Sequence, residues 1–272
     1  MIKLANALLL PAAMGCLVSL SPAPRNPPPC QRIDIMDAAH PNRYHAALVF
    51  DTEGRVVSCN EGFQSMPMLV SYDAKGHVKD VPGMVHAEYD ASTGEIDKLV
   101  VGSGDMFMDF TFVHDRVEIA KLKITDAGLS RTTNFVYAYG NTDKKDADPV
   151  SVQWHYDEYK NGNHTETADA KYLLTYSDDP FFVGNDNVIS RMIYAYPPHA
   201  PVVAVHYRLV SRVQLNIISH DLVNGKDAAL NRNEDYSYKL DGVGRPVSMV
   251  STGTINGKPA PPMTYNIKYS CN

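Results

Sequence analysis

Hydrophobic and polar residues alternate with a period of two along most of the chain from Ala46 onward. Residues 106–115 (MFMDFTFVHD) place large apolar side chains on one face, and residues 129–139 and 151–159 repeat the pattern with aromatic residues. Successive side chains of a β-strand point to opposite faces, so the alternation predicts antiparallel strands with one apolar and one polar face. Helical periodicity is scarce, which favours an all-β fold.

The alternating runs are separated by turns of similar composition. Residues 50–56 (FDTEGRV), 72–78 (YDAKGHV) and 89–96 (YDASTGEI) each carry an aromatic residue, an aspartate, a glycine and then a β-branched residue, and residues 238–245 (YKLDGVGR) are a looser copy. The aspartate can accept hydrogen bonds from its own turn and the glycine can adopt positive φ, so each segment predicts a hairpin. Hairpins in series predict an antiparallel meander that forms a curved sheet or a barrel.

Some stretches interrupt the alternation. The pattern slips at Ala120, which predicts a β-bulge. Residues 141–149 and 161–169 are rich in polar residues and predict loops. Residues 188–219 contain several prolines and predict a strand, an irregular crossing and a second strand. None of these stretches has the composition of an interdomain linker, so residues 30–272 are expected to form a single domain.

The length of the apolar runs also indicates whether the strands could span a membrane. They are shorter than the ~10-residue strands of a membrane barrel, and polar residues interrupt both faces. We therefore expect no membrane-spanning pore. The membrane contact expected is a lipid anchor only.

The N-terminus predicts export. Met1-Ile2-Lys3 gives a short positive start and residues 4–20 are almost wholly apolar, which indicates a secretory signal peptide over residues 1–23. Small residues before Cys16 predict that its thiol is lipidated, and cleavage near Ala23 by the ordinary signal peptidase is the alternative. The expected location is periplasmic or tethered to the outer membrane. Residues 24–29 continue as a stiff proline-rich spacer, or as a disordered terminus.

The cysteines Cys16, Cys30, Cys59 and Cys271 agree with export. If Cys16 is lipidated, one disulfide and one free thiol remain. Cys30 opens the folded part and Cys271 nearly closes it, so a sheet that brings the chain ends together makes Cys30–Cys271 plausible, with Cys30–Cys59 as the competing pair. The spacing of cysteines and histidines fits no zinc site, and no metal or other cofactor is expected.

The serial aromatic-Asp-x-x-Gly turns resemble the YD-type repeats of bacterial surface proteins. With the lipoprotein-like signal and a closing strand that ends in Tyr269-Ser270-Cys271, the chain resembles a Bacteroidota lipoprotein family of unknown function. The resemblance covers most of residues 45–270 and implies a porin-like β fold. It implies no activity and no functional residue. The chain departs from surface-exported members of such groups because no acidic run follows Cys16.

Charge and motifs exclude several classes of function. The net charge of −6 and the lack of interleaved basic and aromatic residues argue against a nucleic-acid partner. The sequence contains no nucleophile-elbow frame, phosphate loop or dinucleotide fingerprint, and its 10 histidines are scattered. No catalytic residue is therefore predicted.

Aromatic residues on adjacent predicted strands provide the remaining candidate site. Trp154, Tyr156, Tyr137 and Tyr139 could stack on a sugar ring or hold an apolar ligand, although such rings more often form the core. The leading hypothesis is a non-enzymatic module that binds an envelope ligand or protein, such as a glycan. The alternatives are a glycan-acting hydrolase with unassigned carboxylates, and a structural or assembly component of the cell envelope.

Overall fold

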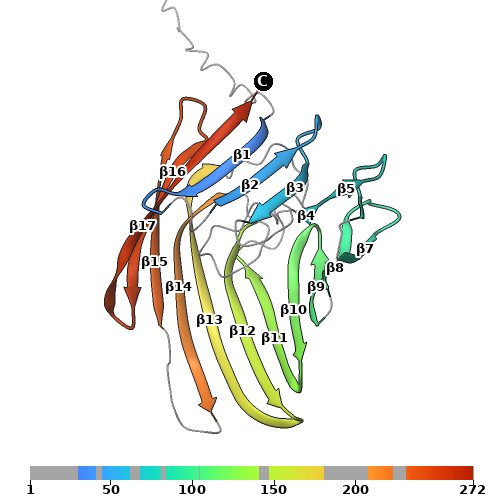
Figure 1. The fold of residues 1–272 in the computed structure, drawn as a ribbon, viewed down its shortest axis with the longest axis vertical. Coiled ribbons are helices and arrows are strands. Elements are labelled where there is room, and N and C mark those ends of the chain that lie inside the picture. Colours follow the sequence, from blue (N-terminus) through green and yellow to red (C-terminus); the bar gives the residue numbers. More distant parts are fainter. Residues whose placement is uncertain are drawn as a thin grey trace, which may run out of the picture.

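The computed structural model contains only strands and turns in the part of the chain that it describes (Figure 1). The predicted signal peptide, the lipidation residue Cys16 and the proline-rich spacer lie outside the described residues, as does most of the predicted crossing at 188–219. The described residues are 30–40, 45–61, 68–80, 84–103, 105–140, 147–180, 208–222 and 231–271.

The strands confirm the predicted all-β fold. They follow one another along the chain as β1 (Cys30–Asp37), β2 (His45–Phe50), β3 (Val56–Glu61), β4 (Met68–Leu69), β5 (Ser71–Tyr72), β6 (Val78–Asp80), β7 (Met84–Tyr89), β8 (Ile96–Ser103), β9 (Met106–Val113), β10 (Arg116–Asp126), β11 (Leu129–Tyr139), β12 (Pro149–Lys160), β13 (Asn163–Pro180), β14 (Arg208–Leu222), β15 (Arg232–Leu240), β16 (Pro246–Ile255) and β17 (Lys258–Cys271).

One 15-stranded antiparallel sheet contains every described strand except β5 and β6, in the order β4-β3-β2-β1-β17-β16-β15-β14-β13-β12-β11-β10-β9-β8-β7. Neighbouring strands are consecutive in the chain, as serial hairpins require, so the predicted meander is confirmed. The exception is β1, which pairs with β17, and there Ile33 lies opposite Tyr269. A disulfide joins Cys30 to Cys271 beside this pairing, and the buried Cys59 takes no part in it.

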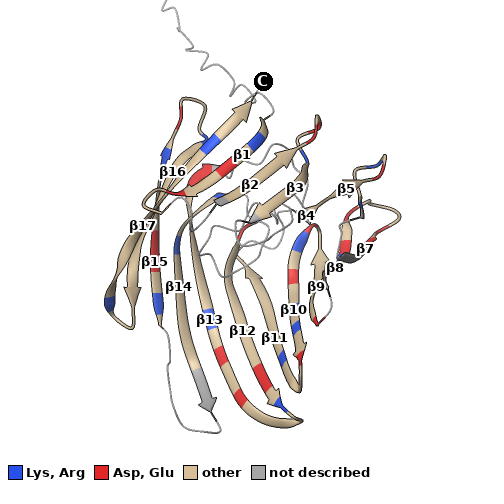
Figure 2. Cartoon of the chain, in the orientation of Figure 1, with Lys and Arg blue, Asp and Glu red and all other residues tan. Residues whose placement is uncertain are grey.

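The two faces of the curved sheet differ in polarity. The inner face carries one cluster of buried apolar residues drawn from most of the strands, including the fully buried Ile33, Val117 and Val152. Burying a side chain of this size stabilises the fold by roughly 1.5–3 kcal/mol. On the outer face, positions such as Gln153 and Lys121 are exposed. Basic and acidic residues are mixed along β10 (Figure 2).

The hairpin turns divide the sheet into two ends. We call the end that carries turns 51–55, 90–95 and 241–245 the turn rim, and the opposite end, with turns 127–128 and 256–257, the far rim. Asp241 shows how the turn-rim hairpins form. Its Oδ1 accepts hydrogen bonds from the backbone N–H groups of Val243 at 3.0 Å and Arg245 at 2.9 Å. Gly244 adopts a φ of 86°, where a side chain would be strained.

Side-chain contacts fasten the small β5–β6 hairpin, which follows the edge strand β4 in the chain and precedes the other edge strand, β7. On the β3 side, the Tyr72 hydroxyl donates to the Val56 carbonyl oxygen at 2.8 Å. On the β7 side, the Val78 backbone N–H donates to the Tyr89 hydroxyl at 2.8 Å, and the His77 ring stacks on Tyr89 with centroids 4.1 Å apart. The hairpin therefore links the two edges of the large sheet through its side chains.

Three details differ from the sequence predictions. The β10 bulge lies between Val117 and Ile119, slightly before the predicted position at Ala120. Residues 161–169 are not a loop, because Asn161 and Gly162 form a tight turn with φ of 50° and 79° and β13 starts at Asn163. The strands are also longer than the apolar runs suggested, since β13 has 18 residues. The polar residues at 163–169 extend β13 beyond its apolar run.

Candidate functional site

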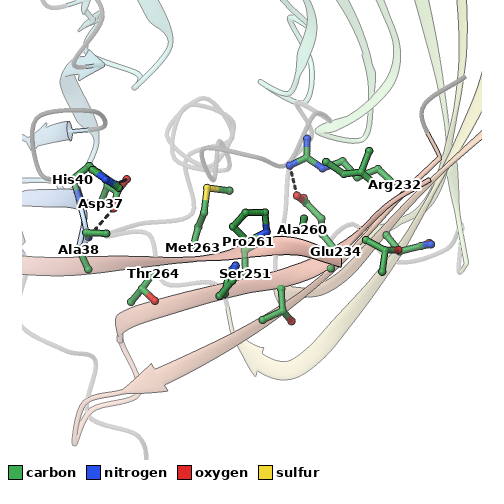
Figure 3. Close-up of a pocket in the computed structure, with 17 residues that line it drawn as sticks. Asp37, Ala38, His40, Arg232, Glu234, Ser251, Ala260, Pro261, Met263 and Thr264 are labelled. Atoms are coloured by element: carbon green, nitrogen blue, oxygen red, sulfur yellow. Dashed lines mark hydrogen bonds and ion pairs between the residues drawn. The ribbon is translucent and has the colours of Figure 1, made fainter. Parts of the chain in front are cut away.

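A pocket of about 680 Å³ lies on the inner face near the far rim, between β15, β16, β17 and the end of β1 (Figure 3). This volume falls in the range of about 300–1,000 Å³ that small-molecule sites occupy. One part of its wall is apolar and includes Ile255, Ala260, Pro261, Pro262 and Met263. The polar part includes Asp37, His40, Arg232, Glu234 and Ser251.

The pocket wall depends on a break in the β16–β17 ladder. The register shifts between Ser251 and Gly253, where Ser251 pairs with Met263 but Gly253 pairs with Ala260. The intervening Pro261 and Pro262 lack the N–H that a ladder needs. Gly253 also allows β15 to approach closely, because a Cβ atom there would lie 2.0 Å from the Asn233 carbonyl oxygen. The sequence therefore builds a bulged, uneven wall at this place.

Arg232 and Glu234 of β15 form the charged part of the pocket, and together with Tyr236 behind them we call them the β15 triad. Arg232, Glu234 and Tyr236 are two residues apart along one strand, so they share the inner face. The Arg232 guanidinium forms an ion pair with Glu234, and the Tyr236 hydroxyl donates to the same carboxylate. Glu234 is only 5% exposed. Burial raises the pKa of Tyr236, and the hydrogen bond to Glu234 raises it further.

The end of β1 supplies the second polar group of the pocket. Asp37 Oδ1 accepts hydrogen bonds from the backbone N–H groups of Ala39 at 2.8 Å and His40 at 3.0 Å. His40 Nδ1 lies 3.7 Å from the other oxygen of Asp37. Burial raises the pKa of Tyr265 to about 12, and the negative charges of Asp37 and Glu234 add to the rise. The Tyr265 hydroxyl therefore stays protonated at physiological pH, and both carboxylates favour this neutral form.

The aromatic residues predicted as ligand contacts have different environments. Tyr137 lies in the core and is only 4% exposed. Tyr139 lies toward the turn rim, where its hydroxyl donates to the Val117 carbonyl oxygen at 2.8 Å and Arg116 covers its ring. Trp154 and Tyr156 are partly buried neighbours on the inner face, with near-parallel rings whose centroids are 5.8 Å apart. The structure thus brings Trp154 and Tyr156 together and gives Tyr137 and Tyr139 packing contacts.

A second polar network adjoins the Trp154–Tyr156 pair, and we call Arg131, Tyr156 and Glu158 the β12 triad. Arg131 Nε donates to Glu158 at 2.7 Å across the β11–β12 pairing. The Tyr156 hydroxyl donates to the same carboxylate at 3.0 Å, and so does the Thr165 hydroxyl at 3.0 Å. The hydrogen bond from Arg131 is the main cause that lowers the pKa of Glu158.

Sequence reasoning missed both triads. The same-face spacing of Arg232, Glu234 and Tyr236 was a usable signal, because residues two apart on a strand lie side by side. Arg131 gave no such signal. Its contact with Glu158 depends on the β11–β12 register, which places Arg131 opposite a residue 27 positions away in the sequence.

Two further observations concern the described residues alone. They contain no group of three or more His, Cys, Asp or Glu side chains arranged to hold a metal ion. They also contain no helix with the length and apolar character needed to cross a membrane.

Comparisons with known proteins give a structural similarity and no family. No family model matches the chain, and no curated protein matches it. Among solved structures, a porin-like protein from Bacteroides uniformis is similar at 11% sequence identity and a TM-score of 0.39, and the match covers 91% of this chain and 100% of that one. The fold assignment rests on the strand order of the sheet. The resemblance to a Bacteroidota lipoprotein family stays a prediction.

Proposed function

We propose that the protein is an exported, membrane-tethered β module that binds a ligand in the inner-face pocket without transforming it. The observation that carries this proposal is the pocket itself, in which an apolar wall around Met263 and Pro261 accompanies the charged side chains of Arg232 and Glu234. Small-molecule sites combine a mostly apolar lining with a few fixed polar groups in this way. The polar groups would orient the ligand and the apolar wall would supply binding free energy.

The contacts of the two pocket carboxylates favour binding over catalysis. One oxygen of Glu234 is paired with Arg232 and the other accepts from Tyr236. Asp37 accepts from backbone N–H groups and faces His40. A glycosidase needs one carboxyl that delivers a proton and a second that attacks or activates water. Both carboxylates instead bind groups of the protein itself. A glycan-acting hydrolase is therefore the second candidate, after a ligand-binding module.

The proposed location comes from the N-terminal sequence, with its signal-like residues 1–23 and the candidate lipidation residue Cys16. The outer face carries polar side chains such as Lys121 and Gln153 together with exposed apolar ones such as Val136 and Ile218.

A ligand screen with a filled-pocket variant tests the proposal. The unfolding temperature of the protein is measured with neutral oligosaccharides, acidic oligosaccharides, fatty acids and amino acids. Ala260→Trp places a large ring in the pocket, and Ser270→Trp adds the same ring on the exposed outer face of β17. We expect at least one class to raise the unfolding temperature of the wild type and of Ser270→Trp, but not of Ala260→Trp.

Two results would contradict the proposal. One is that no class raises the unfolding temperature. The other is that Ala260→Trp, shown by its own cooperative unfolding to be folded, keeps the full response. Release of reducing sugar from any oligosaccharide would show that the protein is a hydrolase and not a non-catalytic binding module.

A further inference from the structure

Two hairpins of the turn rim hold an arginine in the same way. Arg55 Nε donates to the Asp51 carboxylate at 2.7 Å, and Arg245 Nε donates to the Asp241 carboxylate at 2.7 Å. Each aspartate also accepts from the backbone N–H of its arginine, and each guanidinium lies over a tyrosine ring of a neighbouring strand. The repeated turn therefore fixes the guanidinium in the same position in both hairpins.

The two hairpins differ in what the arginine Nη1 atom contacts. In the first hairpin it lies 2.9 Å from the Glu53 carboxylate. The corresponding residue of the second hairpin is Val243, which has no carboxylate. Arg245 Nη1 instead lies 3.0 Å from Cys271 Sγ and 3.4 Å from Cys30 Sγ. The nitrogen that pairs with a carboxylate in one hairpin thus contacts both sulfur atoms of the disulfide in the other.

A guanidinium beside a disulfide favours the reduced state of the two cysteines. The sulfur atoms of a disulfide carry no charge, whereas a thiol that loses its proton becomes an anion. A neighbouring arginine stabilises that thiolate, and stabilising the reduced form makes a disulfide easier to reduce. The Arg245 side chain is only 17% exposed, so solvent screens its charge incompletely. We therefore expect Arg245 to shift the equilibrium toward the dithiol.

The place of the disulfide in the sheet allows it to be reduced while the protein is folded. Cys271 is partly exposed, whereas Cys30 is only 3% exposed. The register of β1 and β17 shifts between Cys30 and Arg32, so the disulfide lies outside the regular ladder, which starts where Arg32 faces Ser270. β1 is also paired with β2. Breaking the disulfide therefore leaves both ladders of β1 in place.

We propose that Cys30–Cys271 is a reversible thiol–disulfide exchange site that a dithiol reductant opens, with Arg245 stabilising the sulfur atoms that leave. This inference is independent of the pocket and goes beyond the proposed ligand-binding function. The reductant is a molecule or protein with two neighbouring thiols. The result of the exchange is a strand β1 that is held by its ladders alone.

The exchange has two steps. A thiolate of the reductant attacks Cys271 Sγ, because Cys271 is the more exposed cysteine, and the electron pair of the S–S bond leaves with Cys30 Sγ as a thiolate beside Arg245. The second thiolate of the reductant then attacks the reductant sulfur of the mixed disulfide and releases Cys271 as a thiolate. The reductant is oxidised to its own disulfide, the protein gains one electron pair, and the protons of the reductant pass to the released thiolates or to water.

A redox equilibrium of the full-length protein tests the inference. The folded protein is equilibrated without denaturant in mixtures of reduced and oxidised dithiothreitol. Alkylation and peptide mass spectrometry then quantify the thiols at positions 30 and 271 separately from the other cysteines. Arg245→Gln removes the charge, Arg245→Lys keeps it, and Arg55→Gln is the matched control, because it removes the same turn contacts at a hairpin without a disulfide.

We expect Arg245→Gln to lower the equilibrium constant for reduction about tenfold, which corresponds to about 30 mV. Arg245→Lys should recover part of this loss, and Arg55→Gln should change the constant less than about twofold. Ultraviolet absorbance of the reduced proteins at neutral pH gives a second readout, with more thiolate in the wild type than in Arg245→Gln.

A purely structural role of Arg245 predicts the opposite sign. Loss of the turn contacts would loosen the hairpin, expose the disulfide and make it easier to reduce. The inference is therefore overturned if Arg245→Gln is reduced as readily as the wild type or more readily, or if its reduced form contains as much thiolate. Equal losses in Arg245→Gln and Arg55→Gln would also overturn it. So would a wild-type disulfide that dithiothreitol reduces only as circular dichroism shows the protein to unfold.

Discussion

The guanidinium carbon of Arg245 lies 5.0 Å from the centroid of the Tyr269 ring, and the hydroxyl of that ring donates to the Pro246 carbonyl oxygen at 2.9 Å. A tyrosine of one strand is thus fixed by two consecutive residues of the neighbouring hairpin. Arg55 covers Tyr72, whose hydroxyl donates to Val56, in the same manner. These contacts recur along the turn rim and tie successive hairpins to one another.

The Tyr269 contacts predict a graded loss of stability. Tyr269→Phe removes the hydrogen bond to Pro246 but keeps the ring under Arg245, so we expect a loss of about 1 kcal/mol in the free energy of unfolding. Tyr269→Ala also removes the packed ring and is expected to cost about 3 kcal/mol or more. Urea unfolding measures both. Tyr159→Phe, at a 40% exposed position, is the control and should change little; equal effects at 159 and 269 would contradict the contact.

Asp241 predicts how much one turn contributes. Asp241→Ala removes the acceptor for the backbone N–H groups of Val243 and Arg245 and the ion pair with Arg245, so we expect a loss of about 1–2 kcal/mol. Asp241→Asn keeps one oxygen for the backbone and is expected to lose less. Chemical denaturation of the two variants measures the difference. If alanine and asparagine were equally tolerated, the turn would not depend on this acceptor.

The Cys30–Cys271 disulfide joins the first and last described strands, which are neighbours within the sheet, across 241 residues of sequence. Replacing both cysteines with serine frees the chain ends in the unfolded state, and we expect a loss of about 2–5 kcal/mol. A thermal unfolding scan with and without reductant measures the same effect in the wild type. The buried thiol of Cys59 should react with a thiol reagent only upon unfolding. Two rapidly reacting thiols in the native, unreduced protein would contradict the pairing.

The contacts of His155 on the outer face predict that the stability of the fold depends on pH. Its Nδ1 lies 2.8 Å from Asp169 and its Nε2 lies 3.0 Å from Asp157. The hydrogen bond with Asp169 is the main cause that raises the pKa of His155 above its usual value of 6.5, with Asp157 adding to it. Because the folded state binds the proton more tightly, the stabilisation is complete below about pH 6.5 and is lost as pH rises through the raised pKa.

An NMR titration of the imidazole signals measures this pKa directly. Asp169→Asn should return the pKa of His155 toward 6.5, and Asp157→Asn should lower it by less. A His155 pKa at or below 6.5 in the wild type would contradict the described contacts.

The strands and turns could be predicted from the sequence because both signals are local. The period of two and the Asp-x-x-Gly turns act over a few residues, and the structure confirms the meander that they indicate. The stretch at 161–169 has the polar composition of a loop, yet the residues from Asn163 onward belong to β13, so composition alone predicts the wrong structure there.

The candidate site was less predictable, because it depends on contacts distant in sequence. Tyr137 and Tyr156 look alike in an alternating pattern, yet one is core and the other joins Arg131 and Glu158. The pocket needs the β16–β17 bulge and the approach of β1, and neither has a strong local signature.

The most direct measurement is the NMR signal of the Met263 methyl group during titration with the ligand class that most raises the unfolding temperature. Met263 lines the pocket. Met106, which is the first residue of β9 and is 53% exposed, serves as the internal reference. We predict a saturable shift of the Met263 methyl signal with the Met106 signal unchanged. A saturable thermal response that leaves the Met263 signal unmoved would show that the ligand binds elsewhere and would contradict the inner-face pocket as the binding site.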